Sequence, residues 1–275
     1  PKSFPSSPEM YNLPLLGSFC AKRGSGKTNA CVLLAQRMKN EYPATRVFIM
    51  SPTVHSPINV VFKTLNADDE DIYDDLDTVN EDLLDIQEKV KQEKEDLFIY
   101  FKRKAIWDAY QKMSVMDDLE QLPDEFLEEL DLMGHEKPTH RWGGKKVHCV
   151  LICDDLSHSA LYSKGRKNVF NNLALRHRHV GFGLSIILCV QTWTTGVPKA
   201  IRQNLTNLWC FHTHDTSQLE SIYKEIGNSV PKDKFYEIYE EACKTPHDFM
   251  SLDLNKKKNH PSEFRKNFDE YILTK

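Results

Sequence analysis

The chain has 275 residues and a net charge of −4, with 40% hydrophobic and 28% charged residues. This is the composition of a folded globular protein and excludes a disordered one. No apolar run approaches the roughly 18 residues that a membrane-spanning helix needs, and residues 1–14 lack the basic-then-apolar pattern of a secretion signal. We therefore expect neither a membrane partner nor secretion.

The first predicted elements form a βαβ unit. An apolar run at residues 13–20 predicts a strand, a loop rich in glycine and serine follows it, and residues 27–40 have a helical pattern. Residues 46–50 form a second buried-type strand. Units of this kind build parallel sheets.

Residues 66–133 differ from the rest of the chain in charge. They hold 23 acidic and 7 basic residues, a charge of −16, so the remainder carries +12. A basic body could bind a polyanion, and ordinary solvated surface explains the same charges equally well. Apolar residues at helical spacing predict two or three helices in this segment. We expect an acidic helical insertion, a lid or an arm, within a domain made of residues 1–65 and 134–275.

The second half of the chain again alternates strands and helices. Strands are expected at residues 147–153, 183–190, 208–212 and 249–254, and helices at residues 217–226 and 232–243. The whole pattern predicts an α/β fold with a central, mainly parallel sheet flanked by helices.

The strongest motif is the sequence AKRGSGKT at residues 21–28, between a predicted strand and a predicted helix. A glycine-rich turn lets successive backbone N–H groups point at phosphate oxygens, and the following helix adds its positive end. Lys27 can reach the β- and γ-phosphates, and the Thr28 hydroxyl can bind Mg²⁺. The standard pattern begins with glycine, where this chain has Ala21. The candidate nucleotide-binding residues are Arg23, Gly24, Ser25, Gly26, Lys27 and Thr28.

Two acidic residues follow the apolar strand at residues 147–153. A strand of this kind delivers a carboxylate from its C-terminal end to the metal beside the phosphates. Asp154 is therefore the candidate Mg²⁺ ligand together with Thr28. Asp155 is the candidate group that polarises the attacking water, in a position where many motor ATPases have glutamate.

Three further side chains are candidates for catalysis. Gln191 ends the strand at residues 183–190, where its amide could sense the γ-phosphate or orient water; a plain strand-end amide is the alternative. Arg176 and Arg178 precede that strand. Either could project into a neighbouring subunit's site as an arginine finger, or simply complement a helix dipole.

The order of these motifs resembles the FtsK–HerA group of DNA-pumping ATPases. GSGKT, the distant strand ending in CDDLS, the basic RHR, the strand ending in glutamine and VPKAIRQN occur in that order. Within the group the chain is most similar to the poxvirus-type genome-packaging ATPases of large DNA viruses, virophages and polinton-like viruses. The similarity extends from about residue 13 to residue 273 and is weakest over residues 66–133.

The resemblance implies a RecA-like P-loop core in a homo-oligomeric ring, a pentamer or hexamer, with ATP at the subunit interfaces and double-stranded DNA in the pore. It implies ATP and Mg²⁺ as cofactors and a capsid or portal-like viral protein as a partner. The protein would act in the host cell cytoplasm, at the virus factory, and could be carried in the virion. The acidic insertion is not expected in the pore, because like charges repel phosphate.

Other functions remain open at the level of the sequence. A HerA-like helicase or a conjugation-type DNA pump belongs to the same group, although such proteins usually carry extra domains. A regulatory nucleotide-binding switch is a different class, and the guanine-recognition motif NKxD of GTPases is absent. A structural virion protein with a degenerate site is disfavoured, because Lys27, Thr28, Asp154 and Asp155 are all present.

Overall fold

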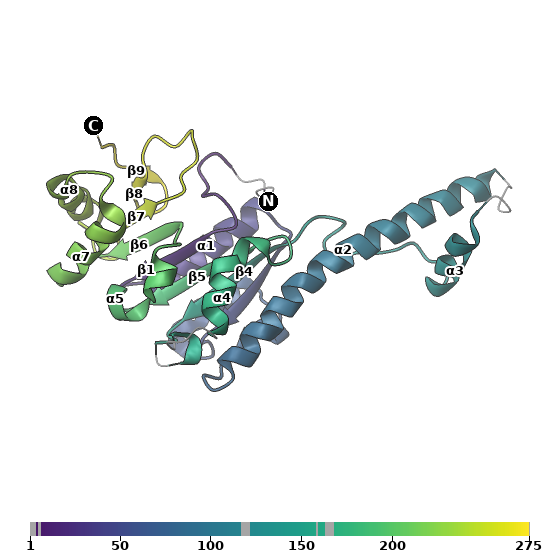
Figure 1. The fold of residues 1–275 in the computed structure, drawn as a ribbon, viewed down its shortest axis with the longest axis horizontal. Helices are drawn as coiled ribbons and strands as arrows, with labels where there is room; N and C mark the ends of the chain where they lie inside the picture. Colours follow the sequence, from purple (N-terminus) through teal and green to yellow (C-terminus); the bar gives the residue numbers. More distant parts are fainter. Residues whose placement is uncertain (1–3, 5–6, 117–121, 158, 163–167, 275) are drawn as a thin grey trace.

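The computed structural model describes residue 4 and residues 7–116, 122–157, 159–162 and 168–274. In this part of the chain one sheet of nine strands has the order β3-β2-β4-β5-β1-β6-β7-β8-β9 (Figure 1). The first six strands in this order are parallel, and β7, β8 and β9 continue the sheet antiparallel. The predicted α/β fold with a mainly parallel sheet is confirmed. The strands are β1 (Leu16–Cys20), β2 (Thr45–Met50), β3 (Ile72–Tyr73), β4 (His148–Asp154), β5 (Leu184–Val190), β6 (Asn207–Phe211), β7 (Phe249–Asp253), β8 (Phe264–Lys266) and β9 (Glu270–Tyr271).

The central strands are buried along their whole length. Every residue of β1, β2, β4, β5 and β6 is buried, which is the consequence of covering both faces of a parallel sheet with helices. This is why these strands read as continuous apolar runs in the sequence. The short strands β3, β8 and β9 have no such run, and the sequence did not predict them.

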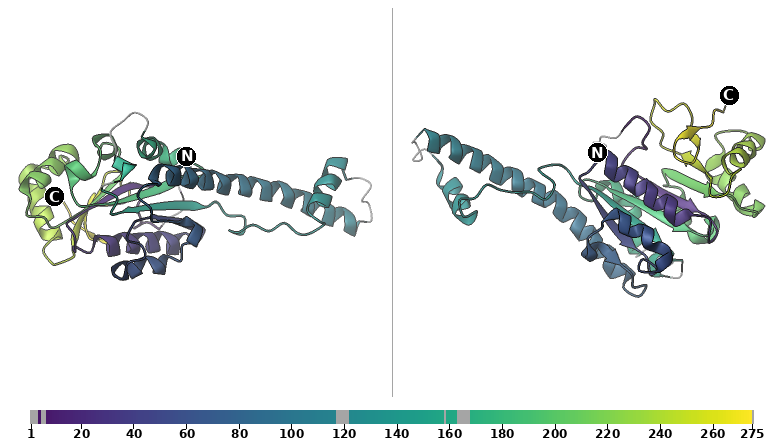
Figure 2. Two further views of the ribbon diagram at one scale, coloured as in Figure 1. Left: turned by 90° about the horizontal axis from the view of Figure 1, so that it is seen from below. Right: turned by 180° about the vertical axis from the view of Figure 1, so that it is seen from behind.

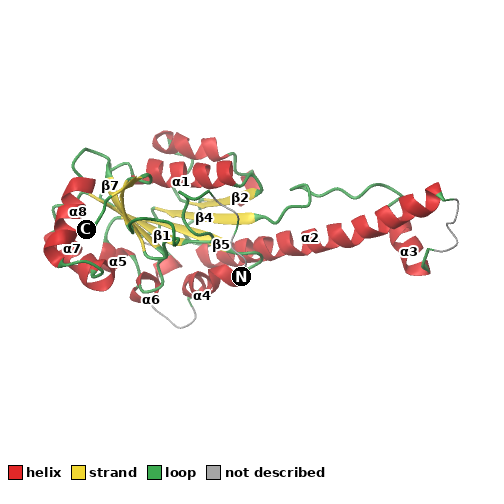
Figure 3. Cartoon of the chain, turned by 90° about the horizontal axis from the view of Figure 1, so that it is seen from above, coloured by secondary structure: helices red, strands yellow, loops and turns green. Residues whose placement is uncertain are grey.

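Helices cover the two faces of the sheet unequally (Figures 2 and 3). One face packs against α1 and the short helix η1, and the other packs against α2, α4 and the helices near the C-terminus. The helices are α1 (Lys27–Glu41), α2 (Val79–Val115), α3 (Asp124–Leu132), α4 (Val169–Arg176), α5 (Trp193–Gly196), α6 (Lys199–Arg202), α7 (Thr216–Ile222) and α8 (Lys232–Ala242). Shorter 3₁₀ and π turns are η1 (Pro57–Leu65), η2 (Asp69–Asp71), η4 (Ala160–Tyr162), η5 (His177–His179) and η6 (Tyr223–Gly227).

Helix α2 has 37 residues, a length of about 55 Å. Its first turns lie under the sheet, and its second half leaves the body and carries α3 at the far end (Figure 1). We call the projecting part, residues 97–141, the arm, and the rest of the chain the body. Residues 117–121 lie outside the described residues. Among the described helices, none is both long and apolar enough to cross a bilayer.

The predicted division into a core of residues 1–65 and 134–275 and an acidic helical insertion at residues 66–133 stays a prediction. β3 lies within that range and pairs with β2 as part of the sheet. The start of α2 belongs to the main core, where Val79, Leu83, Ile86 and Val90 are buried. The reason is that the first half of this helix packs against the sheet and α4, whereas the second half extends beyond the sheet and packs against α3. The segment is therefore partly body and partly arm.

Candidate functional site

The glycine-rich loop connects β1 to α1 in the way that the sequence predicted. The backbone N–H of Ala21 donates to the Val190 carbonyl at 3.0 Å, which fixes the start of the loop against β5. Ala21 is not among the residues with positive φ, whereas Gly24 and Gly26 have φ of 80° and 90°. Glycine adopts such angles without steric cost. An alanine in place of the first glycine of the motif therefore leaves the loop unstrained.

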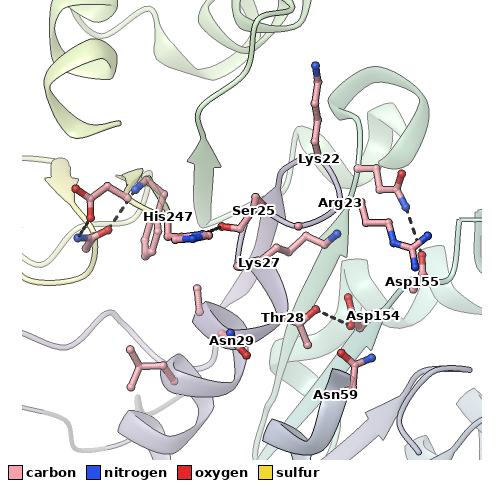
Figure 4. Close-up of a pocket in the computed structure, with 18 of the residues that line it drawn as sticks. Lys22, Arg23, Ser25, Lys27, Thr28, Asn29, Asn59, Asp154, Asp155 and His247 are labelled. Carbon is pink, nitrogen blue, oxygen red and sulfur yellow. Dashed lines mark hydrogen bonds between the residues drawn. The ribbon is translucent and has the colours of Figure 1, made fainter. Parts of the chain in front are cut away.

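The start of α1 offers unpaired backbone donors. Gly26 is the N-cap of the helix and supplies no side-chain capping group. The first N–H groups of a helix have no partner within it, and together with the helix dipole they attract anions. The loop and the first turn of α1 therefore form a phosphate-binding site, with Lys27 and Thr28 pointing into the same cavity (Figure 4).

Asp154 and Thr28 meet at one end of this cavity. The Thr28 hydroxyl donates to Asp154 Oδ2 at 3.0 Å. Adjacent ligands of an octahedral Mg²⁺ at about 2.1 Å from the ion lie about 3.0 Å apart, so the spacing of these two oxygens fits one ion. Burial raises the pKa of Asp154, while the nearby Lys27 ammonium and the hydrogen bond from Thr28 act in the opposite direction. A cation at this point would relieve the cost of burying the carboxylate.

Asp155 and Gln191 lie side by side at the ends of neighbouring strands. β5 lies between β1 and β4 in the sheet, so its C-terminal Gln191 lies between the loop and the two acids. The amide Nε2 of Gln191 is 3.5 Å from Asp155 Oδ1. Asp155 has φ of 56°, an uncommon angle for a residue with a side chain. Both side chains are exposed to the cavity, which is what a group that orients water requires.

Arg176 and Arg178 lie away from this cavity. They end α4 and form part of η5, before the N-terminal end of β5. Since the cavity is at the C-terminal end of that strand, neither arginine lines the cavity of its own chain. Between them, His177 is buried, and its Nδ1 donates to the Leu184 carbonyl at 2.7 Å. A role of either arginine in a neighbouring subunit stays a prediction.

The lining of the cavity extends beyond the predicted residues. The space measures about 800 Å³, within the range of small-molecule sites. One wall comes from the chain after β2, where Asn59 donates to the Thr53 carbonyl at 3.0 Å. The described residues of 66–133 do not line it. Residues that sequence reasoning missed are Lys22, Asn29, Ala30, Leu33, Arg37, Thr53, Ser56, Asn59, His247, Asp248, Phe249, Asn267, Phe268 and Asp269.

The end of the cavity opposite to Asp154 is built from α1 and the antiparallel strands. Leu33 is 44% exposed there, and Arg37 forms a two-bond ion pair with Asp269 at 2.5 and 2.7 Å. Apolar surface beside fixed polar groups is the usual lining for a nucleobase. No sequence signal marks these residues, because they follow β8 or lie on the outer face of α1 and belong to no contiguous motif.

Comparisons with known proteins add a set of structural similarities. No family model and no curated protein sequence matches the chain. The genome packaging NTPase B204 of Sulfolobus turreted icosahedral virus 2, in complex with AMP, is similar with a TM-score of 0.49 and 13% identity, over 94% of this chain and 98% of that one. The DNA-packaging ATPase B204 of Sulfolobus turreted icosahedral virus gives 0.48 and 14%, over 92% and 97%.

A third similar structure is the conjugation coupling protein TcpA of pCW3, with ATPγS. It has a TM-score of 0.45 and 10% identity, over 94% of this chain and 60% of that one. The strand order and the cavity carry the inferences that follow.

Proposed function

We propose that this chain is an ATPase that couples hydrolysis of Mg²⁺-ATP to the movement of double-stranded DNA. One observation carries the proposal: the phosphate-binding loop, the Thr28–Asp154 pair and the Asp155–Gln191 pair converge on a single cavity of about 800 Å³. These are the parts that phosphoryl transfer to water requires, since catalysis of this reaction is mostly positioning and charge stabilisation.

Each residue has a role in this reaction that follows from its position. The N–H groups of the loop and the Lys27 ammonium bind the β- and γ-phosphates. Thr28 and Asp154 are the residues that would hold Mg²⁺, which when bound neutralises charge on the phosphates. Asp155 accepts a hydrogen bond from the attacking water, and Gln191 orients it from the adjacent strand. The nucleoside lies toward Leu33 and the Arg37–Asp269 pair.

Coupling to DNA rests on the motif order and on charge. The residues outside 66–133 together carry +12 of the formal charge, and a basic surface attracts phosphate backbones. Under this proposal the protein forms a ring of five or six copies around DNA, and Arg176 or Arg178 reaches the nucleotide of the next copy. The most specific form of the proposal is a viral motor that packages a genome into a preformed capsid, docked on a capsid or portal-like protein, in the host cell cytoplasm.

The decisive experiment measures ATP hydrolysis with and without double-stranded DNA. We expect DNA to stimulate the wild-type protein, and Lys27→Ala to lower kcat/KM by about 100-fold or more, because it removes a cation from the charge that develops on the phosphates. Lys63→Ala is the matched control, since Lys63 is an exposed lysine outside the cavity. A rate of hydrolysis that does not change when DNA is added would instead indicate a nucleotide-binding switch.

The ring proposal has its own test. Protein carrying both Arg176→Ala and Arg178→Ala is mixed with protein carrying Lys27→Ala, and hydrolysis by the mixture is compared with hydrolysis by each variant alone at the same total protein. We expect the mixture to be more active than either variant, because a Lys27→Ala copy can supply its arginine to the intact site of a neighbouring double-variant copy. A mixture no more active than the two separate variants would contradict an arginine finger acting between subunits.

A further inference from the structure

A histidine from the antiparallel side of the sheet contacts the phosphate-binding loop. His247 lies in the connection between α8 and β7, far along the chain from the loop. Its Nδ1 lies 3.0 Å from the Ser25 carbonyl oxygen. Because a carbonyl only accepts hydrogen bonds, Nδ1 is the donor in this contact. Figure 4 shows the ring on one side of the loop and Lys27, Thr28 and Asp154 on the other.

This contact fixes the orientation of one peptide group. The peptide between Ser25 and Gly26 is planar and trans, so its C=O and its N–H point in opposite directions. With the carbonyl turned toward His247, the Gly26 N–H is turned toward the side where Lys27 and Asp154 lie. Gly26 is the N-cap of α1, so this N–H is one of the donors that α1 leaves unpaired for an anion.

The imidazole also fits closely against the loop. A Cβ at Gly26 would lie 3.3 Å from His247 Nδ1, and Gly26 has φ of 90°. Glycine is therefore required here both for its backbone angle and for the approach of the ring. Loop and ring are matched in shape as well as in hydrogen bonding.

His247 has an uncommon backbone conformation, and the residue next to it is fixed by a hydrogen bond and an ion pair. His247 has φ of 71°, and Asn267, at the end of β8, has φ of 54°. Asp248, next to His247, accepts from Asn267 Nδ2 at 2.8 Å and pairs with Lys266 at 3.0 Å. Burial opposes ionisation of Asp248, but these two partners outweigh it and lower its pKa. Strained residues persist where surrounding structure over-determines them, often at ligand-binding sites.

We propose that His247 is a positioning residue for the nucleotide, which holds the Ser25–Gly26 peptide with its N–H facing the phosphates. The inference rests on the proposed function, since it assumes that the cavity binds ATP. Under this proposal a residue beside the antiparallel strands contributes to phosphate binding, although it lies outside the motif at residues 21–28. The interaction acts through the loop, so the side chain itself need not touch the phosphates.

The test compares two substitutions that tolerate the same backbone angle. His247→Asn keeps a donor at the position of Nδ1, because the amide nitrogen is also bonded to Cγ, and asparagine accepts positive φ. His247→Gly accepts positive φ but has no donor. Binding of Mg²⁺-ATP and of inorganic pyrophosphate is measured by calorimetry, and the Gly26 amide signal is followed by NMR during the pyrophosphate titration.

We expect His247→Gly to weaken binding of both ligands by about tenfold, the effect of one lost hydrogen bond in an ordered anion site. His247→Asn should bind both within about twofold of wild type. The Gly26 amide signal should shift on adding pyrophosphate in wild type and in the asparagine variant, and shift less in the glycine variant. The melting temperature of each variant shows that it is folded.

Three results would overturn the inference. The first is that the glycine variant binds as tightly as wild type. The second is that the asparagine and glycine variants are equally impaired, which would mean that the ring matters and its donor does not. The third is that wild type binds neither ligand; this also removes the proposed function, whereas the first two leave it intact.

Discussion

The body and the arm show the same helix in two environments. In the first turns of α2, the apolar side chains lie in the core beneath the sheet, with Leu83 and Ile86 fully buried. In the arm, Phe98, Ile99 and Phe101 are 58%, 47% and 50% exposed. Both parts have apolar residues at helical spacing, and this spacing is typical of a helix. Whether those apolar side chains are buried depends on whether another part of the fold packs against them. The comparison teaches that an amphipathic pattern specifies a helix but not its partner.

A buried ionic cluster lies in the body, where the arm begins and ends. Arg46 of β2 donates to Asp71 at 2.7 and 2.8 Å and to Glu93 of α2 at 3.1 Å. Glu93 also accepts from Trp142 Nε1 at 2.8 Å, on the segment that returns from the arm. Asp71 and Glu93 are 1% and 5% exposed. The cluster therefore fixes the place where α2 leaves the body.

Removal of Arg46 is expected to have the largest effect. Arg46→Met leaves the buried Glu93 without its cation and leaves Asp71 with Lys89, at 3.5 Å, as its remaining cation. We expect a loss of about 3–5 kcal/mol in the free energy of unfolding, measured with urea. Arg103→Met in the arm is the matched control, because Arg103 also pairs with a glutamate, Glu129 at 2.9 Å, but is 41% exposed. It should cost about 1 kcal/mol or less. Equal losses would contradict the contrast between body and arm.

Acid should destabilise the body through two buried histidines. Burial lowers the pKa of His148 to about 3 and that of His177 to about 4, whereas both titrate near 6.5 when unfolded. Protons then bind the unfolded chain more strongly, so this stability is present above pH 6.5 and falls as the pH drops toward 4. We expect about 2 kcal/mol lost per histidine between pH 7 and pH 5, measured by urea unfolding at each pH.

A substitution tests whether the buried histidines cause this loss of stability in acid. His177→Asn can keep a donor to the Leu184 carbonyl while removing the titration, so it should abolish about half of the histidine-dependent loss. His135→Asn, on the arm where the side chain of His135 is 50% exposed, should leave the difference between pH 7 and pH 5 in place. If the two variants behaved alike, the buried histidines would not be the cause.

Removal of the arm should have the smallest effect. The rings of Tyr100 and His140 lie 5.3 Å apart, so a short Gly/Ser linker can join these residues in place of residues 101–139. We expect Mg²⁺-ATP affinity to be unchanged by calorimetry and the free energy of unfolding to change by about 1 kcal/mol or less, since the segment supplies little of the body's core. Impaired nucleotide binding would show that the arm supports the site.

A longer deletion is the control for this one. Starting it at residue 84 also removes Ile86, Val90 and Glu93, which are buried against the body. We expect that protein not to fold, because it loses both core side chains and the partner of Arg46. Together the two deletions would locate the boundary between body and arm along α2.

Much of the nucleotide site could be predicted, because its main parts are contiguous in sequence. Lys27 and Thr28 are part of an eight-residue motif, and Asp154, Asp155 and Gln191 each follow a strand that is apolar along its length. The ends of parallel strands meet at one edge of a sheet. The arginine pair lies away from the cavity of its own chain, and a role between subunits stays a prediction beside the alternative that it complements a helix dipole.

The sequence by itself determined the α/β pattern, the phosphate-binding loop and the acids at the strand ends, because local backbone geometry and apolar periodicity depend on neighbouring residues. Only the tertiary structure decided that His247 meets Ser25 across 222 positions of the chain, and that α2 is core in one half and arm in the other. Such contacts depend on the order of the strands in the sheet and on which helix surfaces another element covers. Neither can be predicted from a short stretch of sequence.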